Sequence, residues 1–168
     1  RPNTLVFTQR HAGQWLDIIR DVGLALLDRA IHAGAVEKRA PYLRTLAQAF
    51  ANMGRLGDAE YLYRQLAQES GFAAEGLHQI ASLKQRAGQD EEALGLFDEA
   101  LVADPAFLHA YNGKALTLAA LHRFEEAVAV YRKGLEVNPE SGEIHNNLGT
   151  SLRSLGALPR RYHTTGRP

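Results

Sequence analysis

Histidine is the side chain in this sequence with the widest choice of chemistry, because it binds metals, transfers protons and changes charge near neutral pH. The chain contains seven histidines. His78, His109 and His145 fall in successive helical segments and can approach one surface. No two histidines have the i, i+4 spacing of a helical zinc site, and the motif H-E-x-x-H is absent. We therefore expect packing or surface histidines and no bound metal.

Paired carboxylates are the second group that could do chemistry, since two neighbouring acids can act as general acid and base. The pairs Glu91–Glu92 and Glu125–Glu126 each begin a predicted helix. Carboxylates at that position interact with the positive end of the helix dipole, so we interpret both pairs as structural. The nucleophile motif G-x-S-x-G and the phosphate-binding motifs G-x-x-x-x-G-K-[ST] and G-x-G-x-x-G are absent. The sequence predicts no enzyme and no cofactor.

Composition excludes further classes. The 168 residues are 45% hydrophobic, which suffices for a buried core. Nineteen basic residues balance nineteen acidic ones, and Arg160–Arg161 is too short a basic run to indicate nucleic acid. The absence of cysteine excludes disulfides and thiolate sites. No apolar run approaches the roughly 20 residues that span a bilayer, so we expect no nucleic acid partner and no membrane insertion.

The composition and the first residues bear on the origin of the chain. Abundant arginine and alanine are typical of a GC-rich bacterial genome. The chain begins "RPNTLVF", without a start methionine or a signal peptide, which predicts a fragment or a processed form. The compartment stays open between the cytoplasm and the periplasm.

From Pro41 onward, apolar residues recur every three or four positions, which is the helical period. Glycine, proline and polar residues interrupt this pattern at "NMGRLGD", "ESGFA", "RAGQD", "ADPAF", "VNPES" and "SLGAL". The helices between these breaks are about 12 to 14 residues long, too short to be stable alone in water. The sequence therefore predicts helices that pack on their neighbours.

The helical pattern repeats with a period of 34 residues. Small residues in fixed columns allow two helices to approach closely, an aromatic residue fills the space between successive hairpins, and glycine or proline ends the second helix. The columns are Leu46, Ile80, Lys114 and Leu148; Ala47, Ala81, Ala115 and Gly149; Ala59, Ala93 and Ala127; Tyr63, Phe97 and Tyr131; and Gly71, Pro105 and Pro139. Gly54, Gly88 and Gly156 are predicted in the turn between the two helices, where the third unit has His122.

These columns resemble the tetratricopeptide repeat, a 34-residue helix–turn–helix unit. In residues 108–141 the family's features are Tyr111, Ala115, Leu118, Phe124, Ala127, Tyr131, Gly134 and Pro139. The resemblance covers units 40–73, 74–107 and 108–141 and a partial fourth unit, 142–158. It implies an all-α, right-handed α-solenoid of antiparallel helix-turn-helix repeats. Lys84 and Lys114 replace the usual apolar residues and Gly71 replaces the closing proline, so we expect looser packing there.

The two ends of the chain depart from the pattern. Residues 1–39 include apolar residues at helical spacing but match the columns poorly, which predicts a degenerate repeat or an N-terminal capping hairpin. The expected second helix of the fourth unit fails at Pro159 and Arg161. Residues 159–168 are predicted to be irregular, as a disordered tail, a cloning remnant or a join to a larger protein. Since repeat arrays need a cap, we expect the uncapped face of 142–156 to mediate a homo-oligomer.

The resemblance implies that the first helix of each unit lines a concave groove that binds a protein or an extended peptide. Arginines and amides there can hydrogen-bond a peptide backbone or a carboxylate, and Glu75, Ala119 and Glu143 share the outward face. The predicted groove residues are Arg44, Gln48 and Asn52; His78, Ser82, Gln85 and Arg86; His109, Asn112 and Leu116; and Asn146, Thr150 and Arg153.

Three functions remain open at this point. The first is a non-catalytic adaptor that binds a partner in the groove. The second is the recognition arm of a larger enzyme, such as a glycosyltransferase with these repeats, whose catalytic domain is absent here; "HNNLGTSLRSLG" resembles repeats found in such enzymes. The third is a self-assembling scaffold. Co-chaperones with this repeat hold a partner's terminal carboxylate with a clamp of lysines, asparagines and an arginine. The corresponding positions here are Arg44, Gln48, Gln79, His109 and Gly113. Only the first basic position of the clamp is kept, so we do not expect this kind of binding.

Overall fold

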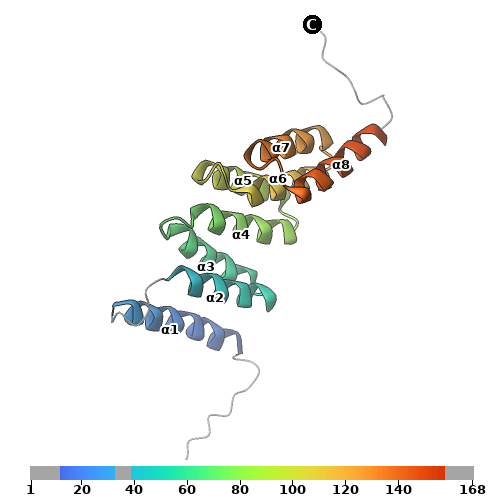
Figure 1. The fold of residues 1–168 in the computed structure, drawn as a ribbon. Helices are drawn as coiled ribbons and strands as arrows, with labels where there is room; N and C mark the ends of the chain where they lie inside the picture. Colours follow the sequence, from blue (N-terminus) through green and yellow to red (C-terminus); the bar gives the residue numbers. More distant parts are fainter. Residues whose placement is uncertain (1–11, 33–38, 158–168) are drawn as a thin grey trace, which may run out of the picture. The chain divides into compact units, whose positions relative to one another are not determined.

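The computed structural model describes residues 12–32 and 39–157, which form eight α-helices and no strand. Figure 1 shows the helices in chain order. The all-α prediction is confirmed. None of the described helices is both long and apolar enough to cross a bilayer. The helices are α1 (Ala12–His32), α2 (Ala40–Asn52), α3 (Leu56–Gln68), α4 (Ala73–Arg86), α5 (Asp90–Ala103), α6 (Leu108–Ala120), α7 (Phe124–Val137) and α8 (Gly142–Ala157).

The chain divides into two compact units between Tyr42 and Leu43, within α2. In the first unit α1 is one continuous helix of 21 residues. Leu24 on this helix is buried, whereas Val22 and Leu26 are more than half exposed. The described side chains do not include several of the apolar residues that follow the helical spacing in this segment: Trp15, Leu16, Ile19, Leu27, Ala30 and Ile31.

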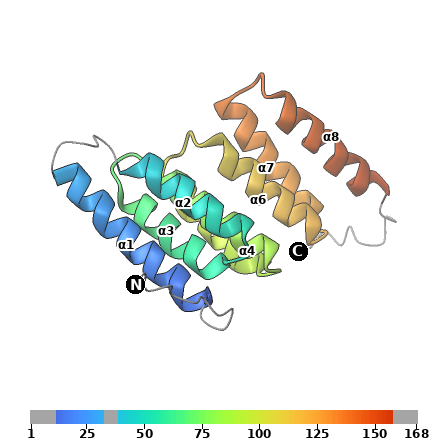
Figure 2. The ribbon, with the colours of Figure 1, turned by 90° about the horizontal axis from the view of Figure 1, so that it is seen from below.

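The second unit contains the hairpins α2–α3, α4–α5 and α6–α7, followed by α8, and Figure 2 shows α6, α7 and α8 as neighbours. Each hairpin turns through a residue in the left-handed region: Gly54 (φ 77°), Gly88 (φ 73°) and His122 (φ 59°). The residue after each turn donates its N–H to a carbonyl five residues earlier, as Arg123 does to Leu118 at 2.8 Å. The turn predicted at Gly156 is wrong, because α8 continues through Ala157.

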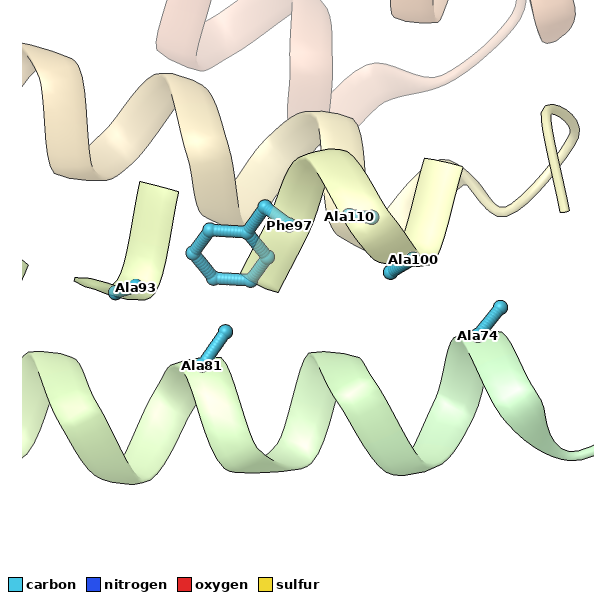
Figure 3. Packing of buried hydrophobic residues seen from close by; sticks show 6 residues of the cluster. All are labelled: Ala74, Ala81, Ala93, Phe97, Ala100 and Ala110. Atoms are coloured by element: carbon cyan, nitrogen blue, oxygen red, sulfur yellow. The ribbon is translucent and has the colours of Figure 1, made fainter. Parts of the chain in front are cut away.

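The small and aromatic columns are buried in the three complete repeats, whereas Gly149 of the partial fourth unit is partly exposed. Ala47, Ala81, Ala115, Ala59, Ala93 and Ala127 have no exposed surface, and Tyr63, Phe97 and Tyr131 are at most 1% exposed. Figure 3 shows Ala74 and Ala81 of α4 pointing toward α5, the helix that carries Phe97. Phe97 also contacts the next hairpin, since a Cβ on Gly113 of α6 would lie 2.6 Å from its ring. The aromatic residue therefore joins one hairpin to the next.

We expected looser packing at Lys84 and Lys114, but both side chains form ion pairs with neighbouring helices. Lys84 Nζ lies 3.4 Å from Glu60 on α3 and 3.2 Å from Glu92 on α5. Lys114 Nζ forms an ion pair with Asp98 on α5. Each lysine side chain is about four-fifths buried, since a long aliphatic stem covers apolar surface while its charged end reaches a carboxylate. Both lysines thus link neighbouring helices.

Candidate functional site

All thirteen predicted groove residues lie on the first helices of the repeats, α2, α4, α6 and α8. We call the surface formed by these thirteen residues the first-helix face. Their exposure falls into two classes. His78, Ser82, Gln85 and Asn112 are partly buried. The exposed members are Arg44, Gln48, Asn52, Arg86, His109, Leu116, Asn146, Thr150 and Arg153.

Arg44, on the first helix of the first repeat, is paired with a carboxylate of the next repeat. Arg44 on α2 and Glu75 on α4 form a two-pronged ion pair, in which Nε contacts Oε1 and Nη2 lies 2.7 Å from Oε2. The guanidinium also lies 5.7 Å from the centre of the Phe72 ring. A paired carboxylate and an aromatic ring together hold Arg44 in place. Arg44 therefore connects two repeats, and its guanidinium is already occupied by the Glu75 carboxylate instead of being available to a ligand.

Polar contacts of the same kind connect the later first helices. Gln85 on α4 donates to the hydroxyl of Thr117 on α6, and that hydroxyl donates to the Gly113 carbonyl at 2.8 Å. Asn112 on α6 donates to Glu143 on α8 at 2.6 Å and accepts from Asn147 at 2.9 Å. Gln85 and Asn112 are thus partly engaged within the fold. Thr117 and Asn147 were missed from sequence, although they lie 32 and 35 residues from their partners, close to the period of the repeat.

Other predicted residues bond within their own unit. Gln48 donates to Asn52 at 3.0 Å and accepts a bond from the Tyr63 hydroxyl at 3.4 Å. Ser82 and Thr150 donate their hydroxyls to the carbonyl one turn earlier, at 3.0 and 3.1 Å. A hydroxyl bonded in this way can still accept a hydrogen bond from a ligand. These residues remain candidates, with part of their capacity already used.

Two of the histidines, His78 and His109, belong to a cluster of aromatic rings. The His78 ring centre lies 5.7 Å from Phe97, 5.6 Å from Phe107 and 6.0 Å from His109. Burial, followed by repulsion from His109, lowers the pKa of His78 to about 4, so the ring is neutral at pH 7. His145 instead contacts the Pro139 carbonyl at 2.7 Å. Within residues 12–32 and 39–157, no three His, Cys, Asp or Glu side chains are placed to share a metal ion.

Several exposed residues of the first-helix face have no side-chain bond to another helix, and two of them are arginines. Arg86 on α4 forms no ion pair, and Arg153 on α8 bonds only to the Thr150 hydroxyl at 3.0 Å. Leu116 on α6 is 45% exposed, and Asn146 is exposed on α8. The other described Lys and Arg of these helices in the second unit each have a carboxylate partner. The exposed residues without a carboxylate partner on this face therefore include two arginines, one on α4 and one on α8, and one apolar side chain on α6.

A separate cavity of about 270 Å³ opens between α5, α6 and α7. It is lined by the Lys114–Asp98 pair, by Lys133 and by four apolar or aromatic residues: Leu101, Val102, Tyr111 and Val130. None of these belongs to the predicted groove. The cavity therefore lies outside the candidate site.

Comparison with known proteins gives the family and the fold. Residues 78–135 and 112–160 match the family model of the tetratricopeptide repeat. An uncharacterized protein of Sinorhizobium fredii is 41% identical over 70 residues, which are 42% of this chain and 38% of that protein. The Hsp70-Hsp90 organizing protein of Triticum aestivum is 34% identical over 70 residues, 42% of this chain and 12% of its own length. This chain therefore spans well under half the length of these two relatives.

Solved structures share the fold at low identity. The first repeat domain of Spaghetti (RPAP3), bound to an HSP90 peptide, superposes with a TM-score of 0.61 and 21% identity, covering 70% of this chain and 94% of that one. The repeat domain of Sgt2 from Aspergillus fumigatus gives a TM-score of 0.62 at 21% identity, over 77% and 90% of the two chains. At this identity the likeness establishes the helical architecture alone.

Proposed function

Because this chain belongs to the tetratricopeptide repeat family, we propose that it is a non-catalytic scaffold that binds an extended peptide or a segment of a partner protein along its first-helix face. Similar folds bind peptides, as the HSP90 peptide in the complex with Spaghetti illustrates. The expected mechanism is many weak contacts along a preformed surface, so that little ordering of the scaffold is needed.

The observation that carries this proposal is that the guanidinium groups of Arg86 and Arg153 have no carboxylate partner, although Arg153 donates to the Thr150 hydroxyl. The other lysines and arginines of these helices in the second unit form ion pairs with carboxylates of the fold. Arg86 is the last residue of α4, Arg153 lies four residues before the end of α8, and Leu116 lies on the intervening first helix α6. Free guanidinium groups bind carboxylates with two parallel hydrogen bonds. Together, Arg86, Leu116 and Arg153 therefore suit a peptide with acidic residues on either side of an apolar one.

Chaperone recognition by a terminal carboxylate clamp is disfavoured. Of the five clamp positions Arg44, Gln48, Gln79, His109 and Gly113, the one permanently charged residue is Arg44, and it is bound to Glu75. Releasing it would leave the Glu75 carboxylate facing an acidic ligand, which costs binding free energy. The peptide class is therefore carried over from the family, whereas the clamp is not.

The proposal is tested with a display library of random linear peptides and the double variant R86E/R153E. Enriched peptides should bind wild type by fluorescence anisotropy, and charge reversal should weaken binding at least tenfold while circular dichroism stays unchanged. A matched control is R132E/K133E, which makes the same change of charge on exposed residues of α7. Equal binding to wild type and R86E/R153E would remove the proposed face.

A second candidate function is a recognition arm within a larger protein. The observation in its favour is that the matched segments make up 38% and 12% of the two relatives named above. The same face would then hold the substrate of another domain. The complete open reading frame distinguishes the two, since a catalytic domain encoded next to these repeats would favour the second.

A further inference from the structure

The hydroxyl of Tyr131 is buried without a hydrogen-bond partner. Tyr131 has no exposed surface, and its hydroxyl has no hydrogen-bond partner among the described residues. Burial, and then the Glu143 carboxylate, raise the pKa of Tyr131 to about 12, so the hydroxyl keeps its proton. A buried donor without an acceptor is unfavourable and rare in folded proteins.

The corresponding positions of the other two repeats avoid an unpaired hydroxyl in two different ways. In the first unit Tyr63 donates to Gln48, which precedes it by 15 residues. In the second unit the corresponding residues are Phe97, which has no hydroxyl, and Ser82. In the third unit Tyr131 corresponds to Tyr63, and Leu116 occupies the position of Gln48. Leu116 thus provides no acceptor, and it is also 45% exposed to solvent.

The third unit therefore combines two unfavourable features at one place. An exposed leucine gains little from burial, and a glutamine there would offer Tyr131 the acceptor that Tyr63 has. Local departures of this kind from the rules of folding are expected where function constrains a residue. We propose that Leu116 is the specificity-determining contact of the first-helix face, which seats an apolar side chain of a bound peptide.

The surroundings define the chemistry of that peptide, and this step rests on the proposed function. Gln85 of α4 bonds to Thr117, so the end of α4 that carries Arg86 lies beside the turn of α6 that carries Leu116. On α8, Arg153 and Asn146 are exposed. The peptide that fits has an aliphatic residue for Leu116, with carboxylates nearby for the two arginines. Its acidic residues supply attraction, and its aliphatic residue supplies selectivity.

The decisive variant is L116Q, because it should move stability and binding in opposite directions. The new amide can accept the Tyr131 hydroxyl, so Tm should rise by about 2 °C. Loss of the apolar contact should weaken binding of the library-selected peptides about tenfold. A general loss of structure cannot produce this combination. A fall in Tm together with unchanged peptide affinity would overturn the inference.

Two control variants separate the parts of the argument. In L116Q/Y131F the gain in Tm should vanish, because no hydroxyl remains, while the loss of binding should persist. In S82Q the same amide is introduced opposite Phe97, and Tm should not rise. If Tm rises equally in S82Q and L116Q, the gain does not come from the Tyr131 hydroxyl and the inference fails.

The peptides themselves distinguish this inference from the proposed function. Selected peptides that share an aliphatic residue and lose affinity for L116Q support both. Peptides that lose affinity for R86E/R153E but bind L116Q like wild type would overturn the role of Leu116 and leave the proposed function standing. If no peptide is enriched over an unrelated helical protein, both proposals fall.

Discussion

Gly76 of α4 packs so closely on Ala67 of α3 that it has no room for a side chain. A Cβ at Gly76 would lie 2.7 Å from the Ala67 Cβ, the Ala67 nitrogen and the Tyr63 carbonyl oxygen. Two of these atoms belong to the backbone of α3, so the contact cannot be relieved by a side-chain rotation. The approach of the second hairpin to the first is therefore set by this glycine.

The substitution G76A should destabilise the protein although alanine is the better helix former. Overpacking against the α3 backbone should lower the free energy of unfolding by about 2 kcal/mol. The matched control is G95A in α5, where no atom lies within 4 Å of the new Cβ. That variant should gain up to about 1 kcal/mol from helix propensity. Urea denaturation measures both, and a gain in stability for G76A would contradict the close contact.

At position 122, glycine should give a more stable protein than alanine. Its φ of 59° is left-handed, whereas the same turn of the first two units uses Gly54 and Gly88. A residue with a Cβ pays roughly 1 kcal/mol in this conformation, so H122G should be about that much more stable than H122A. Both variants lose the ring contact with Phe124, which makes H122A the proper reference. Equal melting temperatures for H122G and H122A would show that the turn is not strained.

Stability should fall as pH drops from about 6.5 to about 4, partly because of His78. Its folded pKa is about 4, below the value of 6.5 for an unperturbed histidine. In this window the unfolded chain binds a proton that the folded chain does not, so protonation favours unfolding. The effect should be about 2 kcal/mol. Urea titrations at several pH values should show a shallower slope for H78Q than for wild type; parallel curves would contradict the assignment.

The exposed face of α8 should support self-association. Leu152 is 42% exposed, whereas Phe50 and Leu118 at the same repeat position are 2% exposed beneath their second helices. An uncovered position of this kind tends to pack on another surface. Light scattering after size exclusion should show a dimer whose share rises with concentration, and L152R should remain monomeric. A monodisperse monomer of wild type at high concentration would remove this prediction.

The repeat columns predicted the fold well because they record positions that every unit buries in the same way. Ala81 and Ala93 could be placed in the core from their period alone, and both are fully buried. The end of α8 could not be predicted equally well. Gly156 looks like a turn residue locally, but the helix continues past it.

The chemistry of the first-helix face was less accessible to sequence analysis. A column identifies the position of a residue within its unit but not the residue that it meets in the next unit. The pairing of Arg44 with Glu75 depends on how successive first helices are set side by side, and so does the pairing of Gln85 with Thr117. Sequence alone does not show whether the Tyr131 hydroxyl meets an acceptor elsewhere in the fold, and in the structure no described residue provides one.

The central claim is that the free arginines of the first-helix face bind the partner. The most direct measurement is the dissociation constant of one library-selected peptide for wild type, R86E/R153E and R132E/K133E, at equal ionic strength. The account predicts at least a tenfold weakening for R86E/R153E and a change below twofold for R132E/K133E on α7. Equal weakening in both variants would show a general charge effect and would contradict binding at this face.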